Sequence, residues 1–217
     1  MKVPLIQVDR VVSVPFEENS FIVQLSGRND CLVVDPGLEP EKILRRLEDM
    51  NCTPAAILVT HGHADHIAGN AVLKQRWPQC QLMIGVLDAP KLTDPAQNLS
   101  GAFGFQLVSP RADVMLQDGE KFSIAGMTLE VLAIPGHSTG HVVYLCRDQQ
   151  PYLAFVGDVV FAGSVGRTDF PDGDFGQLSA GIRAKLYSLP DDTILLPGHG
   201  PQTTVGREKH TNPFVQG

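Results

Sequence analysis

The sequence predicts an α/β domain in which two inner β-sheets are covered by helices on their outer sides. Short apolar runs typical of strands recur along the whole chain, and a few amphipathic stretches typical of helices interrupt them. With 217 residues, of which 43% are hydrophobic and 19% charged, the chain has the size and apolar content of one globular domain, which we assign to residues 1–217. The order of elements alone leaves other α/β architectures open.

In the first half of the chain, apolar runs predict strands at residues 5–12, 21–25, 31–34, 55–59 and 81–84. The third of these ends at Asp35-Pro36-Gly37, a strong turn signal. Residues 39–50 place Ile43, Leu44 and Leu47 at helical spacing with charges opposite, which predicts an amphipathic helix. A second helix is expected at residues 68–76.

In the second half, residues 88–110 are loop-rich, with a modest helical signal at their start. A long loop in a compact domain often covers an active site. Strands are predicted at residues 121–124, 128–134, 142–146, 152–156 and 193–196. Between the last two, residues 176–188 place Leu178, Ile182 and Leu186 at spacings of four, which predicts another amphipathic helix.

Composition limits the classes of partner. The net charge is −7 and there is no cluster of Lys and Arg, so we expect no nucleic-acid partner. No apolar stretch approaches the roughly 20 residues that span a bilayer, and the N-terminus lacks the apolar core of a signal peptide, so we expect no membrane association. The four cysteines form no CxxC pair, which favours a reducing, cytoplasmic location.

A dense group of metal-ligand side chains follows the strand at 55–59. Within six residues lie three histidines and an aspartate: His61, His63, Asp65 and His66. Imidazole and carboxylate suit zinc, manganese or iron, and the absence of thiolates argues against a structural Cys-type zinc site. Two histidines separated by one residue can bind one ion from the same side, whereas the Asp-His pair at the start of a helix points elsewhere and can serve a second ion. We expect Gly62 and Ala64 to leave the backbone room to turn sharply.

Three further candidate ligands each follow an apolar strand: His137, Asp158 and His199. Loops at strand ends, held by a rigid scaffold, are where functional sites usually form. We interpret His137 as a third ligand of the first ion, Asp158 as a carboxylate bridging both ions, and His199 as a ligand of the second ion.

Three other polar residues receive different interpretations. Asp35 is predicted to accept a hydrogen bond from an imidazole N–H and so to fix the orientation of that ring. His141 opens an apolar strand and is interpreted as a buried, hydrogen-bonded structural residue. His210 lies in a polar tail and is expected to be exposed on a helix.

The segments DPG, THGHADH, PGHSTGH, GD and PGHG, in this order, resemble the metallo-β-lactamase superfamily. The stretches GSVGRTDFP and GREKHTNPF are similar to those of short, single-domain type II glyoxalases (hydroxyacylglutathione hydrolases). The resemblance implies a four-layered αββα sandwich. It also implies a first metal site at His61, His63 and His137, a second at Asp65, His66 and His199, and Asp158 as the bridge. Arg167 matches a basic position that would hold a substrate carboxylate through forked hydrogen bonds.

Together these features predict a cytoplasmic metallo-hydrolase with two divalent ions, zinc being favoured over iron or manganese. A metal-bridging hydroxide would attack a small-molecule thioester such as S-lactoylglutathione, and no catalytic side chain beyond the metal ligands is assigned. The chain ends before the C-terminal helical extension with which larger type II glyoxalases bind glutathione, so the resemblance implies thioester hydrolysis but leaves open whether glutathione is the thiol.

Other functions remain as alternatives. A mononuclear iron persulfide dioxygenase of the same fold would use His61, His137 and Asp158, and shares a GRTDF-like segment. A lactonase or β-lactamase would direct the same hydroxide at another activated carbonyl. A nucleic-acid phosphodiesterase is disfavoured by the acidic charge, and a metal-binding regulator without turnover is disfavoured by a complete ligand set.

Overall fold

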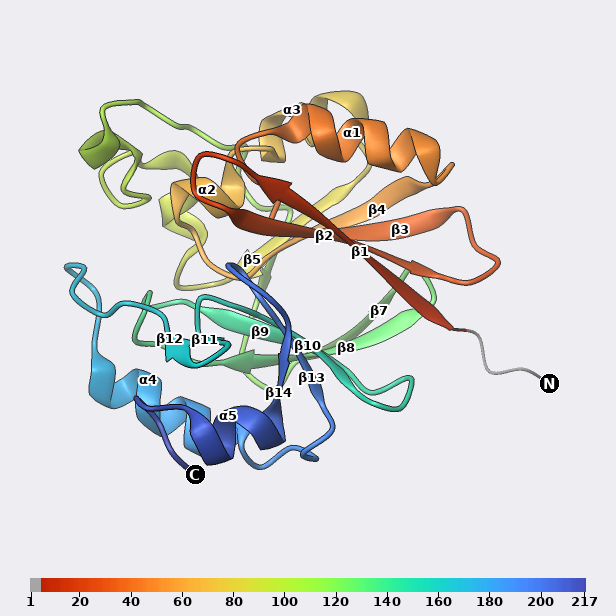
Figure 1. Cartoon of the computed structure of the whole chain (residues 1–217). Helices are drawn as coiled ribbons and strands as arrows, with labels where there is room; N and C mark the ends of the chain where they lie inside the picture. The colour runs from red at the N-terminus through yellow and green to blue at the C-terminus, as the bar shows by residue number, and fades with distance from the viewer. Residues whose placement is uncertain (1–4) are drawn as a thin grey trace.

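Two six-stranded β-sheets face each other, and helices cover the outer side of each (Figure 1). The structure, a computed structural model, describes residues 5–217, so that residues 1–4 of the predicted domain lie outside the described part. The expected layering, with sheets inside and helices outside, is confirmed.

The first sheet has the strand order β1-β2-β3-β4-β5-β6. The pairs β1–β2 and β2–β3 are antiparallel, and the remaining pairs are parallel. Its strands are β1 (Ile6–Ser13), β2 (Glu18–Leu25), β3 (Asp30–Val34), β4 (Thr53–Val59), β5 (Gln81–Gly85) and β6 (Val114–Leu116). Three helices belong to this half of the molecule: α1 (Pro40–Asp49), α2 (Ala64–Ile67) and α3 (Asn70–Arg76). Figure 1 shows α1 and α3 on the outer side of this sheet.

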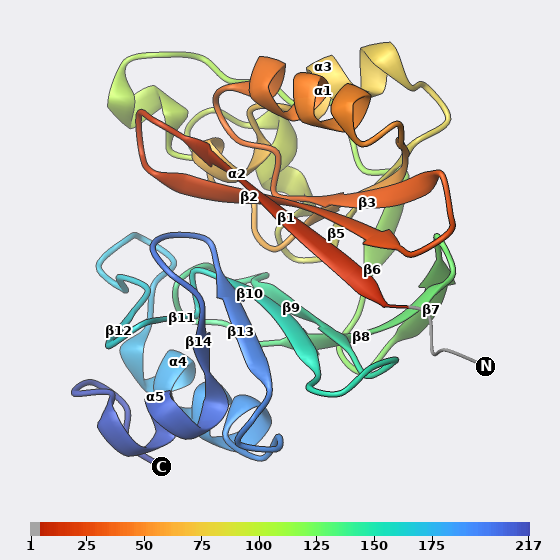
Figure 2. The same cartoon turned by 45° about the vertical axis from the view of Figure 1, so that its right-hand side comes forward.

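The second sheet has the strand order β14-β13-β10-β9-β8-β7, with β10 and β13 parallel and the other pairs antiparallel. Its strands are β7 (Lys121–Ile124), β8 (Met127–Ala133), β9 (Val142–Cys146), β10 (Leu153–Gly157), β13 (Ile194–Pro197) and β14 (Thr203–Thr204). The helices α4 (Phe175–Gly181) and α5 (Val205–Thr211) cover its outer side, as the rotated view shows most clearly (Figure 2). A separate hairpin of β11 (Val160–Phe161) and β12 (Ser164–Val165) extends beyond β10.

Alternation along the strands divides the apolar residues among three clusters. In β4, Leu58 belongs to the cluster between the sheets, while its neighbours Ile57 and Val59 pack with the helices outside. In β9, Tyr144 likewise faces inward and Val143 faces the helices of the second half. Because successive strand residues point to opposite faces, a strand buried on both sides is apolar throughout, which is why these runs were visible in the sequence.

The predicted helices differ from the observed ones in detail. The helix expected at residues 68–76 is α3, which begins two residues later at Asn70. The short helix α2 precedes it, and the chain turns between the two at Gly69, whose N–H donates to the carbonyl of Pro36 at 2.8 Å. The helix expected at residues 176–188 begins as α4 and continues as a π-helical turn over Ile182–Leu186. The strands β6, β11, β12 and β14 were not predicted, since two or three residues are too few to show an alternating pattern.

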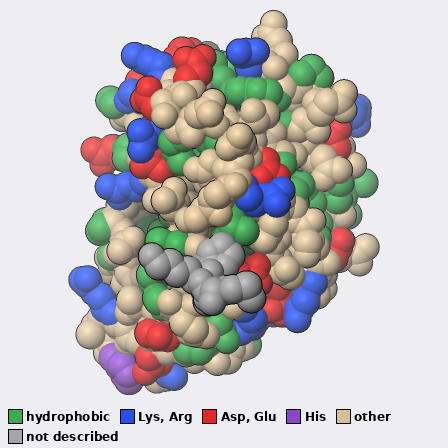
Figure 3. All heavy atoms as spheres, turned by 90° about the vertical axis from the view of Figure 1, so that its right-hand side faces the viewer, with side chains coloured by type: hydrophobic (Ala, Val, Ile, Leu, Met, Phe, Trp, Pro, Cys, Tyr) green, Lys and Arg blue, Asp and Glu red, His purple; other side chains and the backbone are tan. Residues whose placement is uncertain are grey.

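The loop-rich stretch contains two short 3-10 helices, η1 (Ala89–Thr93) and η2 (Ser100–Phe103). Within residues 5–217, no helix combines the length and the apolar character needed to span a bilayer. On the face shown in Figure 3, acidic and basic side chains are interspersed.

Candidate metal centre

The predicted ligands meet because four strands end near one another. His61 follows β4 of the first sheet, while His137, Asp158 and His199 follow β8, β10 and β13 of the second. The parallel pairing of β10 with β13 places their carboxyl ends side by side. Two hydrogen bonds tie the sheets together beneath this edge: the N–H of Val142 donates to the carbonyl of Thr60, and the Tyr144 hydroxyl donates to the carbonyl of Val59, both at 2.8 Å.

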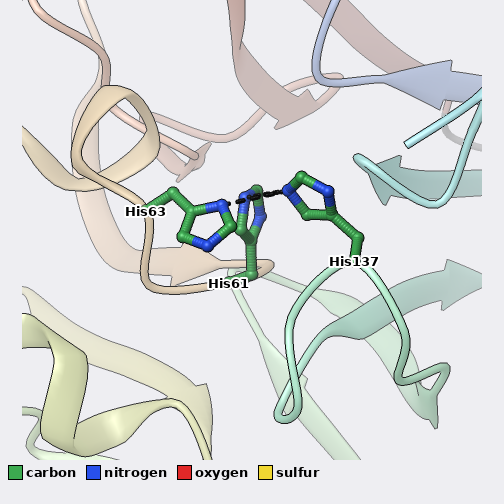
Figure 4. Close-up of side chains that lie close together, drawn as sticks. All are labelled: His61, His63 and His137. Carbon is green, nitrogen blue, oxygen red and sulfur yellow. Dashed lines mark hydrogen bonds between the residues drawn. The ribbon is translucent and has the colours of Figure 1, made fainter. Parts of the chain in front are cut away.

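A first group of donor atoms comes from three imidazole rings (Figure 4). The Nε2 of His137 lies 3.0 Å from Nδ1 of His63 and 3.2 Å from Nε2 of His61. All three residues are buried, and the three donor atoms lie within 4.8 Å of one another. Three converging neutral nitrogens at this spacing match a divalent transition-metal site.

A second group lies beside the first. The side chains of Asp65, His66 and His199 bring one donor atom each within 4.8 Å of the others. Asp158 stands between the groups, because its oxygens lie 3.5 Å from Nε2 of His66, of His137 and of His199. The structure therefore brings all seven predicted ligands together, with one carboxylate facing both groups.

The donor atoms fit divalent ions. Within residues 5–217, Nε2 of His66 and Oδ1 of Asp158 are buried, 3.5 Å apart, and have no hydrogen-bond partner. Burying polar atoms without partners costs about 1–3 kcal/mol each, and bonds to a metal ion would offset this cost. Two groups of ligands with one carboxylate between them indicate a dinuclear site.

The second nitrogen of most rings has a fixed partner. The Nδ1 of His137 lies 2.8 Å from the carbonyl oxygen of Arg167, that of His199 lies 2.9 Å from the carbonyl oxygen of Phe16, and that of His61 lies 3.1 Å from the Thr60 hydroxyl. Such contacts fix the tautomer and the orientation of each ring. Sequence reasoning missed the partners of His137 and His199, because a backbone carbonyl leaves no signal in residue type.

Asp35 lies behind the second group. Its Oδ2 is 3.2 Å from Nδ1 of His66, in position to accept a hydrogen bond from that ring. Thr60 donates to the same carboxylate through its backbone N–H and its hydroxyl, both at 2.7 Å. The carboxylate therefore supports β4 and the ring of His66 together.

The first residues after β5 connect the two histidine loops. Asp88 is fully buried, and its carboxylate accepts from the N–H of Gly62 at 2.8 Å, the N–H of Gly140 at 2.7 Å and the Ser138 hydroxyl at 2.5 Å. Gly62 lies between His61 and His63, so one carboxylate positions the loops that carry all three rings of the first group. The start of the 88–110 stretch thus holds in place the two loops that carry the first group of ligands.

Lys91 neutralises this carboxylate. Its side chain is only 7% exposed, and its Nζ lies 3.4 Å from Asp88, 2.6 Å from Asp172 and in hydrogen-bond contact with the Ser138 hydroxyl. Asp172 in turn accepts from the N–H of Thr139 at 3.0 Å. No local sequence pattern marked this network, which joins residues up to 81 positions apart.

Gly62 is needed for its lack of a side chain rather than for a left-handed backbone conformation. Its φ is not in the left-handed region; instead a Cβ at this position would lie 2.5 Å from Cβ of Lys91 and 3.1 Å from the carbonyl oxygen of Asp88. A Cβ on Gly140 would collide with the N–H of Asp88. Both glycines are required by close approach to the start of η1.

The other two histidines lie as interpreted. His141 is fully buried, and its Nε2 accepts from the backbone N–H of Asp158 at 3.0 Å, which positions the carboxylate. Its ring also stacks on that of His61, with centroids 4.7 Å apart. His210 is exposed on α5.

The imidazoles of the two groups differ in the direction of their pKa shifts, although burial opposes protonation in both. Burial lowers the pKa of His63 to about 3 and also lowers the pKa values of His61 and His137. Burial opposes protonation of His199 as well, but hydrogen bonds to Asp158 and Asp65 raise its pKa to about 10. The pKa of His66 is raised for the same reason, since Asp65 and Asp158 outweigh the effect of burial. These shifts favour neutral imidazoles in the first group and protonated imidazoles at His66 and His199 in the second, while the pKa of the Asp65 carboxyl is lowered by its histidine neighbours despite its burial.

We expect this difference to appear as proton release on metal binding. A histidine must be deprotonated to ligate, so filling the first group at pH 7 should release almost no protons, whereas filling the second should release about one from His66 and about one from His199. Affinity for the second ion should therefore rise steeply with pH. The measurement is a calorimetric zinc titration of metal-free protein in buffers of different ionisation enthalpy. Equal proton release in both binding events would contradict the assignment, and His210→Ala should leave both events unchanged.

A cavity of about 450 Å³ opens onto the two groups, and His63, Asp65, His137, Asp158 and His199 lie in its wall. Arg167 also lines the cavity. Its Nε and one terminal nitrogen each donate to Asp169 at 2.7 Å, so the fork expected to hold a substrate carboxylate already holds a carboxylate of this chain.

Comparisons with known proteins agree with this geometry. A sequence model of the Metallo-beta-lactamase superfamily matches residues 14–199. The hydroxyacylglutathione hydrolase GloC of Haemophilus influenzae is 36% identical over 211 residues, covering 92% of this chain and 93% of that protein.

Two solved structures are similar over their whole length. The BLEG-1 B3 metallo-beta-lactamase superposes with a TM-score of 0.92 at 33% identity, covering 97% of this chain and 100% of the other. TTHA1623, solved in a di-iron-bound form, superposes with a TM-score of 0.83 at 37% identity, covering 96% and 100%.

Proposed function

The chain belongs to the metallo-beta-lactamase superfamily, and we propose that it hydrolyses acyl thioesters such as S-lactoylglutathione with two divalent ions, zinc being favoured. The observation that carries the proposal is Asp158, whose carboxylate faces both groups of ligands at the base of an open cavity. The whole-length similarity to a hydroxyacylglutathione hydrolase supports the choice of thioester.

The first group, His61, His63 and His137, would hold one ion, and Asp65, His66 and His199 the other, with Asp158 between them. When bound, such a pair of ions lowers the pKa of a shared water toward about 7 and polarises a carbonyl oxygen. In the overall reaction the C–S bond breaks, water adds its oxygen to the acyl carbon, and a carboxylic acid and a thiol are formed.

Among residues 5–217, no serine, threonine or cysteine lines the cavity. The Ser138 hydroxyl donates to Asp88 and contacts Lys91, so it is held away from a substrate. Cys31, Cys52, Cys80 and Cys146 are all buried, and burial raises the pKa of the Cys31 and Cys80 thiols. A thiolate is therefore not offered to the cavity, which favours direct attack by water over a covalent intermediate.

A β-lactam is a second substrate class, favoured by the TM-score of 0.92 to a B3 metallo-beta-lactamase. The same activated water attacks a strained amide carbonyl. The persulfide dioxygenase alternative would need one iron at His61, His137 and Asp158. It leaves Asp65 and His199 without a role, although their closest side-chain atoms are 3.4 Å apart and both line the cavity.

The proposal is tested by offering metal-loaded protein three substrates: S-lactoylglutathione, a chromogenic cephalosporin, and glutathione persulfide with oxygen. We expect thioester hydrolysis with zinc and no oxygen uptake. Oxygen consumption with iron, the thioester being left intact, would replace the proposed function with the dioxygenase. Hydrolysis of the cephalosporin alone would replace it with the lactamase.

A further inference from the structure

The cavity above the ligands has aromatic walls. Four of the ten phenylalanines of the chain line it: Phe16, Phe103, Phe161 and Phe170. They come from four separate segments: the turn between β1 and β2, the end of η2, the end of β11 and the loop after β12. The fold thus gathers apolar rings around a site whose base is polar.

Two of these rings form an exposed pair at the rim. Phe103 is 56% and Phe16 is 36% exposed, and their ring centroids lie 5.3 Å apart at 74°. Large apolar side chains left in water beside a cavity mark a surface that binds an apolar group. The pair links the first sheet to the long loop, so the loop completes the cavity wall.

Leu99 adds to the same wall from a strained backbone. Its φ is +68°, in the left-handed region that non-glycine residues rarely adopt. The neighbouring Asn98 is fully buried and holds this conformation, because its side chain donates to the carbonyls of Lys91 at 3.1 Å and Leu107 at 3.0 Å. Strain maintained in this way is typical of binding and catalytic sites.

The opposite wall brings aromatic rings against the ligands. The Phe161 ring packs edge-on to His199, with centroids 5.9 Å apart. The Phe170 ring does the same with His63 at 5.1 Å and His137 at 5.7 Å. A group attached to the reacting carbon or sulfur would therefore lie between two apolar walls.

The cavity offers no free cation to an anionic substrate. Arg167 is the only Lys or Arg among its lining residues in the described chain, and both its bonds are to Asp169. Its guanidinium also stacks 4.4 Å over the Phe170 ring. With a net charge of −7, the protein does not attract the two carboxylates of a glutathione group through its overall field.

We propose that the site takes thioesters in which an uncharged aromatic or branched apolar group is attached on the acyl or the thiol side, in preference to glutathione thioesters of small hydroxy acids. This proposal rests on the proposed thioester hydrolysis and narrows its substrate class. Burying a ring-sized apolar group contributes a preference of roughly tenfold to a hundredfold.

The test uses four thioesters that combine lactoyl or phenylacetyl with glutathione or N-acetylcysteamine. For the metal-loaded full chain, we expect kcat/KM to be highest for phenylacetyl-N-acetylcysteamine, by at least about tenfold over S-lactoylglutathione. The two mixed compounds show on which side the apolar group acts. A kcat/KM for S-lactoylglutathione equal to or above the other three would overturn the proposal.

Phe103→Ala should lower kcat/KM for the phenylacetyl thioester about tenfold more than it lowers kcat/KM for the lactoyl thioester. Phe214→Ala is the matched control, since Phe214 is 55% exposed and lies outside the cavity lining. Phe16→Ala, the partner ring, provides a second variant. Equal losses for both acyl groups in both cavity variants would also overturn the proposal.

A binding measurement separates this inference from the proposed reaction. The thioether S-phenethyl-N-acetylcysteamine resists hydrolysis, and we expect calorimetry to show it binding at least about tenfold more tightly than S-methylglutathione, with Phe103→Ala removing most of the difference. If no thioester is hydrolysed but this preference is found, the reaction is wrong and the apolar cavity assignment stands. If thioesters are hydrolysed without the preference, the inference is wrong and the reaction stands.

Discussion

Replacing Asp158 with Asn is expected to lower thioester hydrolysis by at least about a thousandfold. The carboxylate is the only side chain whose oxygens lie 3.5 Å from imidazoles of both ligand groups within the described residues. A neutral amide removes a negative charge from between two cations and turns one oxygen acceptor into a donor. Losing about 4 kcal/mol of charge stabilisation corresponds to roughly three powers of ten in rate.

The variant is compared with wild type for kcat/KM and for bound metal, on whichever thioester the protein cleaves fastest. Asp192→Asn is the control, because Asp192 is an exposed aspartate on the surface. It should match wild type in both measurements. If the Asp158→Asn protein retained activity within about tenfold of wild type, the Asp158 carboxylate would not be a shared ligand of the two ions during the reaction.

The second large effect concerns stability. Replacing Lys91 with Met is expected to lower the free energy of unfolding by about 3 kcal/mol, because it leaves the buried Asp88 carboxylate without its neutralising cation. The same change loosens the contacts to Gly62, Ser138 and Gly140, which position the first ligand group. Metal affinity should fall by about tenfold to a hundredfold, as for other contacts that orient ligands.

Urea unfolding of chelator-treated protein measures the first effect, and competition with a chromogenic zinc chelator measures the second. Lys74→Met is the matched control: Lys74 also pairs with an aspartate, Asp113, at 2.7 Å, but that partner is 43% exposed. An ion pair with one partner exposed to water contributes about 0–1 kcal/mol, and the other contacts of the Lys74 Nζ, to the carbonyls of Pro78 and Cys80, involve no ligand loop. If the two substitutions destabilised the protein equally and left zinc affinity unchanged, Lys91 would not help to position the metal ligands.

Most of the fold was predictable because its strands are buried on both faces. The run Ala55–Val59 is apolar without interruption because Leu58 packs between the sheets while Ile57 and Val59 pack against helices. A strand of this kind is visible from composition alone. β6 was missed because only three of its residues pair with β5.

The ligand positions were predictable for a related reason. Each polar side chain interrupts the sequence just after an apolar strand, and three of the seven histidines of the chain fall within six residues, a density typical of a metal site. The cavity walls were not predictable in this way. Phe16 and Phe103 meet only because the long loop folds back over the first sheet, and an exposed phenylalanine in a loop carries no local sign of its partner.

The same limit applies to the network around Asp88. Lys91 lies in the short helix η1 and contacts Asp172, which is 81 positions away. Neither residue stands in a motif of metal-ligand spacing. Contacts of this kind depend on how loops from both sheets converge. The hydrophobic periodicity of a single segment does not predict which loops will meet.

The most direct test of the two-ion centre is a titration of metal-free protein with zinc or iron, following thioester hydrolysis, oxygen uptake and bound metal together. We predict that hydrolysis rises until about two equivalents are bound and that no oxygen is consumed. Maximal activity at one equivalent of iron, with oxygen consumed and the thioester intact, would contradict a two-ion hydrolytic centre.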